Sequence, residues 1–195
     1  MSPRLTLLLI AAVLTFWMLG AYNRLVRLRN VIATVFQGFA LQALERTGLV
    51  SRLSDLAREH MAERDDLIEA AVQADKALSR ALEAARLKPV QPRTVAELGR
   101  CDHALALSLD ALCASLREHV GYVDTQFDPE VQHPVIIVLE RLAGVLEQTD
   151  FARLTYNQAV GDYNAAIRQF PSTVVAALFG FKAAALLPEV PRSAG

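Results

Sequence analysis

The sequence predicts an all-α protein in which one N-terminal transmembrane helix continues into an antiparallel bundle of three long helices and a short fourth. Three observations lead to this prediction. The chain is 53% apolar and rich in alanine and leucine, apolar residues recur with helical spacing in several windows, and only nine glycines occur among 195 residues. Alternating runs of β-branched residues, which are typical of strands, are scarce. The length suits one domain beside the anchor.

We divide the chain into four parts on these patterns. They are a short tail (1–4), a transmembrane helix (5–23), a helical bundle (24–187) with linkers near 87–93 and 121–133, and a flexible tail (188–195).

Residues 5–23 contain no charged side chain, and Arg4 and Arg24 flank them. Nineteen helical residues at about 1.5 Å each give roughly 28 Å, which is enough to cross a hydrocarbon core. Trp17 and Tyr22 lie toward the C-terminal end, where aromatic side chains favour the membrane interface. Two alternatives stay open, a buried core helix and a cleaved signal peptide, although Leu19-Gly20-Ala21 is a poor cleavage site.

Arg24, Arg27 and Arg29 follow this span, whereas only Arg4 precedes it. The positive-inside rule then predicts a single-pass protein of the inner membrane, with the N-terminus outside and the bundle in the cytoplasm. Arg24 and Arg27 can also lie against lipid phosphates.

The first helix is expected to leave the membrane without a break and to continue to Arg86, with weak points at Gly38 and Thr47–Gly48. The two prolines in LKPVQPRT mark a linker. Thr94 with Glu97 then predicts a capping box. The next helix should run to about Val120, with one apolar face made of Val95, Leu98, Cys101, Leu105, Leu109, Leu112 and Leu116.

Pro134 suits the first turn of a last long helix. Five side chains step by four, three, four and three along it and form one stripe, which a packed partner would cover: Tyr156, Val160, Tyr163, Ile167 and Phe170. Arg153 is the one charged interruption of the stripe. Asn157 and Asn164 flank the seam and can bond across it.

Pro171 ends this helix, because proline lacks an N–H group and restricts the residue before it. The apolar piece that follows, residues 173–181, is too short to span a membrane. It either closes the bundle as a fourth helix or lies on the bilayer or on a neighbouring subunit.

Two ordered motifs resemble the signatures of the LemA family. The first is Tyr22-Asn23-Arg24-Leu25-Val26-Arg27-Leu28-Arg29-Asn30, and the second comprises Tyr156-Asn157, Tyr163-Asn164, Ile167, Phe170-Pro171 and Ala177-Leu178-Phe179-Gly180-Phe181-Lys182. The resemblance implies a membrane-anchored helical bundle of unsettled role, in which these signature residues are structural. The chain departs from the family in FQGFALQALERTGLVSRL, where Gly48 and Ser51 stand in place of the usual Asp and Pro.

No catalytic, cofactor or metal motif is recognisable in the sequence. His-Glu-x-x-His and zinc-type cysteine spacing are absent, as is a glycine-rich phosphate loop. Cys101 and His103 point to different faces of one predicted helix. Cys101 and Cys113 lie about 18 Å apart along that helix, too far to form a disulfide with each other. Unpaired thiols suit a reducing compartment, and a net charge of −1 gives no basic surface for nucleic acid.

We therefore expect a scaffold rather than an enzyme, with no cofactor. Its expected partners are the lipid bilayer, membrane or cytoplasmic proteins that the sequence does not identify, and a second copy of the chain in a homo-oligomer. Two alternatives stay open: an accessory subunit in envelope signalling or stress response, and an enzyme whose site is not recognisable.

Overall fold

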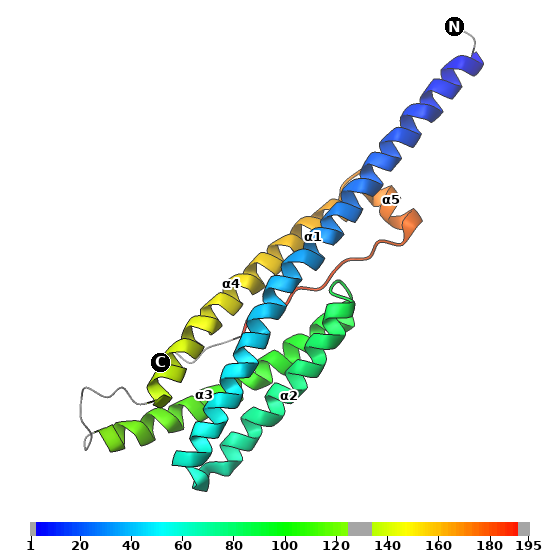
Figure 1. The fold of residues 1–195 in the computed structure, drawn as a ribbon. Helices are drawn as coiled ribbons and strands as arrows, with labels where there is room; N and C mark the ends of the chain where they lie inside the picture. Colours follow the sequence, from blue (N-terminus) through cyan, green and yellow to red (C-terminus); the bar gives the residue numbers. More distant parts are fainter. Residues whose placement is uncertain (1–2, 125–133, 191–195) are drawn as a thin grey trace.

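The computed structural model describes residues 3–124 and 134–190, and all regular structure in these ranges is helical (Figure 1). The prediction of an all-α chain is therefore confirmed. The elements are α1 (Pro3–His60), a 3-10 turn (Ala62–Arg64), α2 (Asp65–Leu87), α3 (Pro92–Asp124), α4 (Pro134–Arg168) and α5 (Ser172–Phe179). Residues 181–190, called the C-terminal segment below, follow α5 without regular structure.

Helix α1 is a single rod of 58 residues, or about 87 Å at 1.5 Å per residue. Its N-terminal third projects beyond all other elements (Figure 1). The large apolar side chains between Leu5 and Leu19 are exposed. In the described chain, α1 is the one helix long and apolar enough to cross a membrane, and only 6% of its most apolar window is buried. The alternative of a buried core helix is therefore wrong.

The expected weak points at Gly38 and Thr47–Gly48 do not interrupt α1. The helix ends instead at His60, and Met61 turns the chain into α2 with a side chain that is 1% exposed. The described chain thus has four long helices and a short fifth, one long helix more than expected. Asp65 and Asp66 in the first turn of α2 suit the positive end of its helix dipole.

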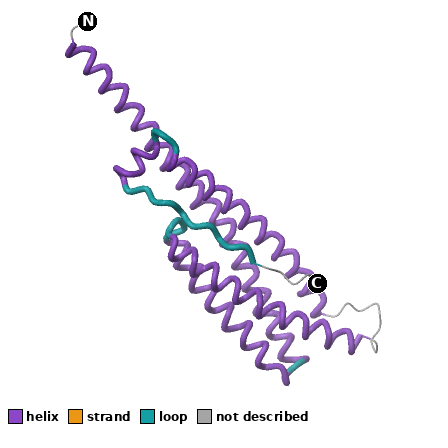
Figure 2. Tube along the Cα trace, turned by 180° about the vertical axis from the view of Figure 1, so that it is seen from behind, coloured by secondary structure: helices purple, strands orange, loops and turns teal. Residues whose placement is uncertain are grey.

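Helices α1 and α4 lie side by side and run in opposite directions, and α2 and α3 form a hairpin beside them (Figures 1 and 2). Among residues 3–124 and 134–190, three apolar clusters hold this helical body together. The largest, around Phe36, Phe39 and Tyr156, joins α1 to α4 and the C-terminal segment. A second, around Leu53 and Leu112, lies at the end far from the N-terminus. The third joins α1, α4 and α5.

Several boundaries differ from the expected ones. Helix α3 begins at Pro92, and the Thr94 hydroxyl donates to the carbonyls of Lys88 or Gln91 (3.0 and 2.9 Å), so the capping box with Glu97 is wrong. Helix α3 also continues to Asp124, and the rest of the second expected linker, 125–133, lies outside the described residues. Helix α4 begins at Pro134 as expected and ends just before a cis Phe170–Pro171 bond.

The end of the chain forms the short closing helix expected for the tail, and contact of this helix with a bilayer or a second subunit stays a prediction. One face of α5 closes the helical body, since Val175 and Ala176 pack with Leu25. Its other face is open, with Val174, Leu178 and Phe179 exposed.

Gly180 caps α5 with a φ of 69°, a value that favours glycine, and the C-terminal segment then runs back along the body (Figure 2). The Pro188 ring lies so close to Gly99 of α3 that an added Cβ there would be 2.5 Å from it. The predicted flexible tail begins at this contact, and its last five residues, 191–195, lie outside the described chain.

Candidate functional site

Two repeats of Tyr-Asn, seven residues apart on α4, form the most organised polar site of the molecule. Tyr156 and Tyr163 are 0% and 2% exposed, and Asn157 and Asn164 lie partly buried beside them. We call these four side chains the Tyr-Asn ladder. A heptad brings each residue type back to nearly the same face of a helix, so both pairs face the C-terminal segment.

The Asn side chains form hydrogen bonds with the backbone of that segment. Asn164 donates to the Ala184 carbonyl and accepts from the Ala184 N–H, at 2.9 Å each. Asn157 makes the same two bonds with Leu187, at 2.8 Å each. The expectation that these residues bond across a helical seam is corrected, because their partner is an extended segment.

The tyrosine hydroxyls complete the ladder. Tyr163 donates to the Lys182 carbonyl at 2.9 Å. The Tyr156 hydroxyl lies 2.8 Å from the Pro89 carbonyl oxygen and 3.1 Å from that of Ala185, and can donate to either. Burial raises the pKa of both tyrosines above the usual value, although the nearby charge of Arg29 opposes the rise for Tyr163. Both hydroxyls therefore remain donors at neutral pH.

Replacing Asn157 or Asn164 with alanine should lower the free energy of unfolding by about 1–3 kcal/mol, because each change leaves a buried N–H and C=O without partners. Chemical denaturation of the purified chain measures this loss. The matched control is Gln158→Ala at the exposed position next to Asn157, which should change stability by less than about 0.5 kcal/mol. Equal effects at Asn157 and Gln158 would contradict the role of the ladder.

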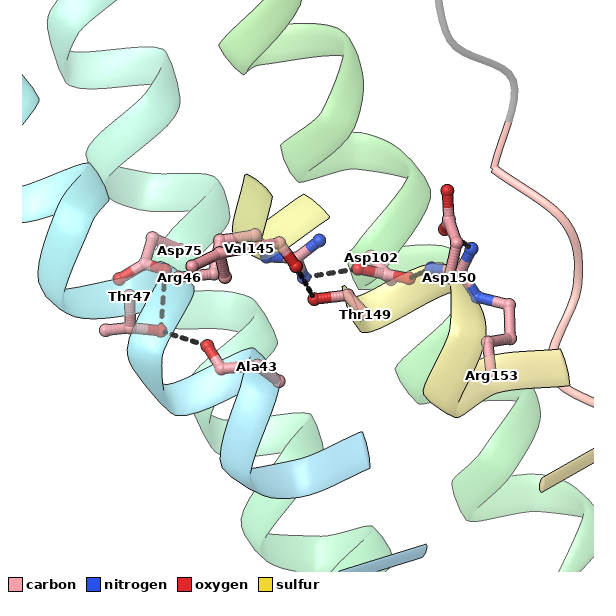
Figure 3. Close-up of polar contacts among 9 residues, drawn as sticks. All are labelled: Ala43, Arg46, Thr47, Asp75, Asp102, Val145, Thr149, Asp150 and Arg153. Atoms are coloured by element: carbon pink, nitrogen blue, oxygen red, sulfur yellow. Dashed lines mark hydrogen bonds and ion pairs between the residues drawn. The ribbon is translucent and has the colours of Figure 1, made fainter. Parts of the chain in front are cut away.

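A second polar site is buried between three helices. Asp102 of α3 forms ion pairs with Arg46 of α1 and with Arg153 of α4, the latter at 2.6 Å (Figure 3). The Arg46 and Asp102 side chains are 2% exposed and that of Arg153 is 7% exposed. Arg153 also pairs with Asp150 at 2.5 Å. One carboxylate thus joins three helices, and we call these residues the charge network.

The charge network borders a cavity of about 210 Å³, lined by α1, α3, α4 and the C-terminal segment. The Nε atoms of Arg46 and Arg153 are buried without a hydrogen-bond partner. Arg46 and Arg153 are nevertheless balanced in charge by Asp102 and Asp150. Paired ions of this kind orient helices, and the network offers neither a free base nor a nucleophile.

A smaller polar link joins α1 and α2 beside this network. The Thr47 hydroxyl donates to Asp75 at 3.0 Å (Figure 3). Desolvation raises the pKa of Asp75, although the bond from Thr47 and the charge of Arg46 oppose the rise.

Sequence reasoning missed the charge network because it assigned the apolar face of α3 to Cys101. In the structure Asp102 is 1% exposed, whereas Cys101 is only partly buried. A signal was present: Leu98, Asp102 and Leu105 step by four and three, so an acid at that position required a buried partner. Arg153, the recognised interruption on α4, is that partner.

The second cysteine, Cys113, lines the cavity and is 8% exposed. Desolvation raises the pKa of its thiol to about 11, from an ordinary value of 9.0. We expect iodoacetamide at pH 8 to modify Cys101 first and Cys113 only after unfolding, because the thiolate is the reactive form. Mass spectrometry of the alkylated chain over time measures both rates.

The same thiol predicts a pH dependence of stability. Between about pH 9 and 11 the folded thiol keeps its proton while the unfolded thiol loses it, so the folded state binds more protons and stability falls as the pH rises. The loss should be smaller in Cys113→Ala, as measured by denaturation at pH 8 and pH 10.5. A loss of the same size in both proteins would contradict this assignment.

The residues expected at the membrane interface gather where α1 meets α5. Trp17 packs on Phe170, with ring centroids 4.9 Å apart, and Tyr22 packs on Phe179 and Phe181 at 5.0 and 5.7 Å. The three arginines expected to follow the membrane all lie exposed: Arg24, Arg27 and Arg29.

The remaining signature residues are divided between core and surface. Leu25 is fully buried, and Leu28 and Ile167 pack against the clusters. Asn23, Asn30 and Phe170 are exposed. Among the described residues, no group of three or more His, Cys, Asp or Glu side chains could hold a metal ion.

These features define a class of protein: an all-helical chain with a projecting apolar N-terminal helix and a C-terminal segment bound by a Tyr-Asn ladder. The chain belongs to the LemA family, whose family model matches residues 36–193. The match includes the Tyr-Asn ladder and begins after the first motif, Tyr22 to Asn30. A comparison with curated proteins gives no match.

Proposed function

We propose that this chain is a membrane-anchored helical scaffold of the LemA type that acts through protein–protein contact, including contact with a second copy. The observation that carries the proposal is the projecting apolar part of α1, which continues without a break into the helical body. A stiff connection of this kind holds the body at a fixed orientation to the bilayer. The charge network and the ladder, which have their partners inside the molecule, support a structural rather than a catalytic role.

The contact between α1 and the junction of α4 and α5 supports the proposal of a retained membrane anchor. Removal of residues 1–21 as a signal peptide would take away Trp17 and with it the contact to Phe170. With 5–23 in the bilayer, the open face of α5 lies at the interface, where Leu178 and Phe179 can enter the headgroup region. The exposed arginines that follow the span support, by the positive-inside rule, the proposal that the helical body lies in the cytoplasm and the N-terminus outside.

The surface proposed for contact is an apolar groove between α1 and α4. It encloses about 540 Å³ and is lined by Val35, Gly38, Gln42, Glu147, Gln148, Phe151, Ala152 and Thr155. Phe151 is 71% exposed, and nothing lies within 4 Å of where a Cβ of Gly38 would be. A large exposed side chain thus stands beside an open notch.

The occupant proposed for this groove is the same groove of a second copy. Two chains anchored in one bilayer are parallel, so a two-fold axis between them runs along the membrane normal and joins residues at equal height. Phe151 and Gly38 line one groove and therefore lie at similar height. Phe151 of each copy can enter the Gly38 notch of the other, which makes the surface self-complementary.

Energy transfer between differently labelled full-length chains in vesicles tests this surface. Phe151→Glu should reduce the transfer by at least half, because a charge replaces the inserted ring. The matched control is Leu107→Glu, at an exposed leucine of α3 outside the groove, which should leave the transfer unchanged. Transfer at the background level for the wild-type chain, or equal loss in both variants, would contradict the proposal.

A further inference from the structure

The C-terminal segment is held as a bound peptide is held. Its links to the Tyr-Asn ladder all reach its backbone, at the N–H or C=O groups of Lys182, Ala184, Ala185 and Leu187. Only two of its side chains are buried, Ala184 at 6% exposed and Leu187 at 1%. The segment is thus bound by hydrogen bonds to its backbone and by burial of two side chains, as extended peptides are bound.

The spacing of the ladder explains why it fits an extended chain. Two residues seven apart on a helix are separated by about 10.5 Å. Three residues of extended chain cover about 9–10 Å. Successive Tyr-Asn repeats of α4 therefore contact residues of the segment that are three positions apart. Asn164 bonds to the backbone at position 184 and Asn157 to that at position 187. Leu186, between these positions, points out and is 55% exposed.

The groove holds two buried side chains of the segment and the proline that follows the second of them. The first pocket holds alanine, and the second holds leucine in the cluster shared by α1, α2, α3 and α4. Pro188 follows and lies against Gly99, where no larger residue of α3 would fit. The groove thus holds an extended segment in which alanine and leucine, three positions apart, are buried, and a proline follows the leucine directly.

The segment is attached in a way that allows it to leave. It follows Gly180, which has no Cβ and whose backbone is therefore less restricted than that of other residues. It forms no helix, and it buries few side chains compared with any of the long helices. Segments of this kind open at a lower free energy than the core that binds them.

We propose that the Tyr-Asn ladder is a peptide-binding groove and that it accepts the C-terminal segment of a second copy in exchange for its own. A second copy is the source because its segment carries the one sequence seen to fit both pockets, Ala184 to Pro188. The inference rests on the proposed association of anchored copies, because a shared membrane raises the local concentration of the competing segment. Exchange of this kind joins two chains without any new type of contact.

Two full-length variants with complementary defects test the exchange. Leu187→Asp prevents burial of the segment's leucine and leaves the groove unchanged. Asn157→Ala with Asn164→Ala removes the hydrogen bonds that the groove makes and leaves the segment unchanged. Tagged Leu187→Asp chains that are inserted together with the second variant into vesicles, and then solubilised, should capture the second variant at least tenfold more than either variant captures itself. Capture at the level of the self-pairs would overturn the proposal, provided that circular dichroism shows both variants to be helical.

Hydrogen exchange of the wild-type chain provides a measurement that does not depend on the variants. The amides of Ala184 and Leu187 should exchange faster than that of Val160 in the buried part of α4. Exchange of all three only by global unfolding would overturn the proposal.

Association through the α1–α4 groove and exchange of the C-terminal segment remain distinguishable. If wild-type chains associate in vesicles but the complementary variants show no excess capture, association stands and the exchange fails. If excess capture occurs without dependence on Phe151, the exchange stands and the α1–α4 surface fails.

Discussion

Replacing Asp102 with alanine will lower the free energy of unfolding by about 3–5 kcal/mol, because it leaves two buried guanidinium groups without their shared carboxylate. Arg46 loses its ion pair, and Arg153 keeps only Asp150. Both arginines already have a buried Nε atom without a partner, so neither has a spare interaction to offset the loss. Chemical denaturation followed by circular dichroism at 222 nm measures the effect.

Two control proteins separate the charge network from simple loss of an acid. Glu118→Ala removes an exposed acid on the same helix and should change stability by less than about 0.5 kcal/mol. The triple change of Arg46→Met, Asp102→Leu and Arg153→Met should recover most of the loss, because apolar side chains of similar size replace all the buried ions together. A triple variant as unstable as Asp102→Ala would show that the three residues do not act as one unit.

The sequence was sufficient for the features that depend on local pattern. An uncharged stretch from Leu5 to Asn23 requires a long apolar helix, and the heptad from Tyr156 to Phe170 requires a helix with one buried stripe. The structure has both helices, but α4 ends at Arg168, so Phe170 lies outside the helix and, at 73% exposed, is not part of the buried stripe. The resemblance to the LemA family, drawn from the two motifs, is also confirmed by the family match.

The position of the first helix break could not be found from glycine content. Gly38 and Gly48 are exposed on α1, where nothing lies near their missing side chains. An exposed glycine costs a helix only about 1 kcal/mol, which the packing of Phe36, Phe39 and Val50 on the same helix offsets. The break at Met61 has no proline or glycine. Its visible signal was the pair of acids that begins α2.

The partner of the Tyr-Asn ladder depends on contacts between distant parts of the chain. The stripe on α4 predicted that Tyr156 and Tyr163 would be covered, and they are. It did not distinguish a helical partner from an extended one, because both bury apolar stripes. Asn157 and Asn164 held the missing information: an amide can satisfy one N–H and one C=O of the same residue, and only a chain without its own helical bonds leaves both groups available.

Changing Ile10 and Leu14 to arginine will prevent stable membrane insertion. Both side chains are exposed on the projecting part of α1, near the middle of the expected span. Arginine is less favourable than leucine or isoleucine at the centre of a transmembrane helix by about 3 kcal/mol per residue, and the two changes add to roughly 6 kcal/mol. The double variant should therefore move from the membrane fraction to the soluble fraction or to aggregates, as fractionation and immunoblotting will measure.

The matched control for this prediction is Leu87→Arg, at a leucine of α2 that is 83% exposed outside the expected span, and it should stay in the membrane fraction.

Intact mass of the wild-type chain tests retention of the anchor, because a chain lacking its first two dozen residues would show that α1 begins as a cleaved signal. Labelling of a C-terminal tag in intact cells with a membrane-impermeant reagent tests the orientation. Since the arginines after residue 23 are expected to remain in the cytoplasm, the tag should react only after permeabilisation, and reaction in intact cells would place the helical body outside.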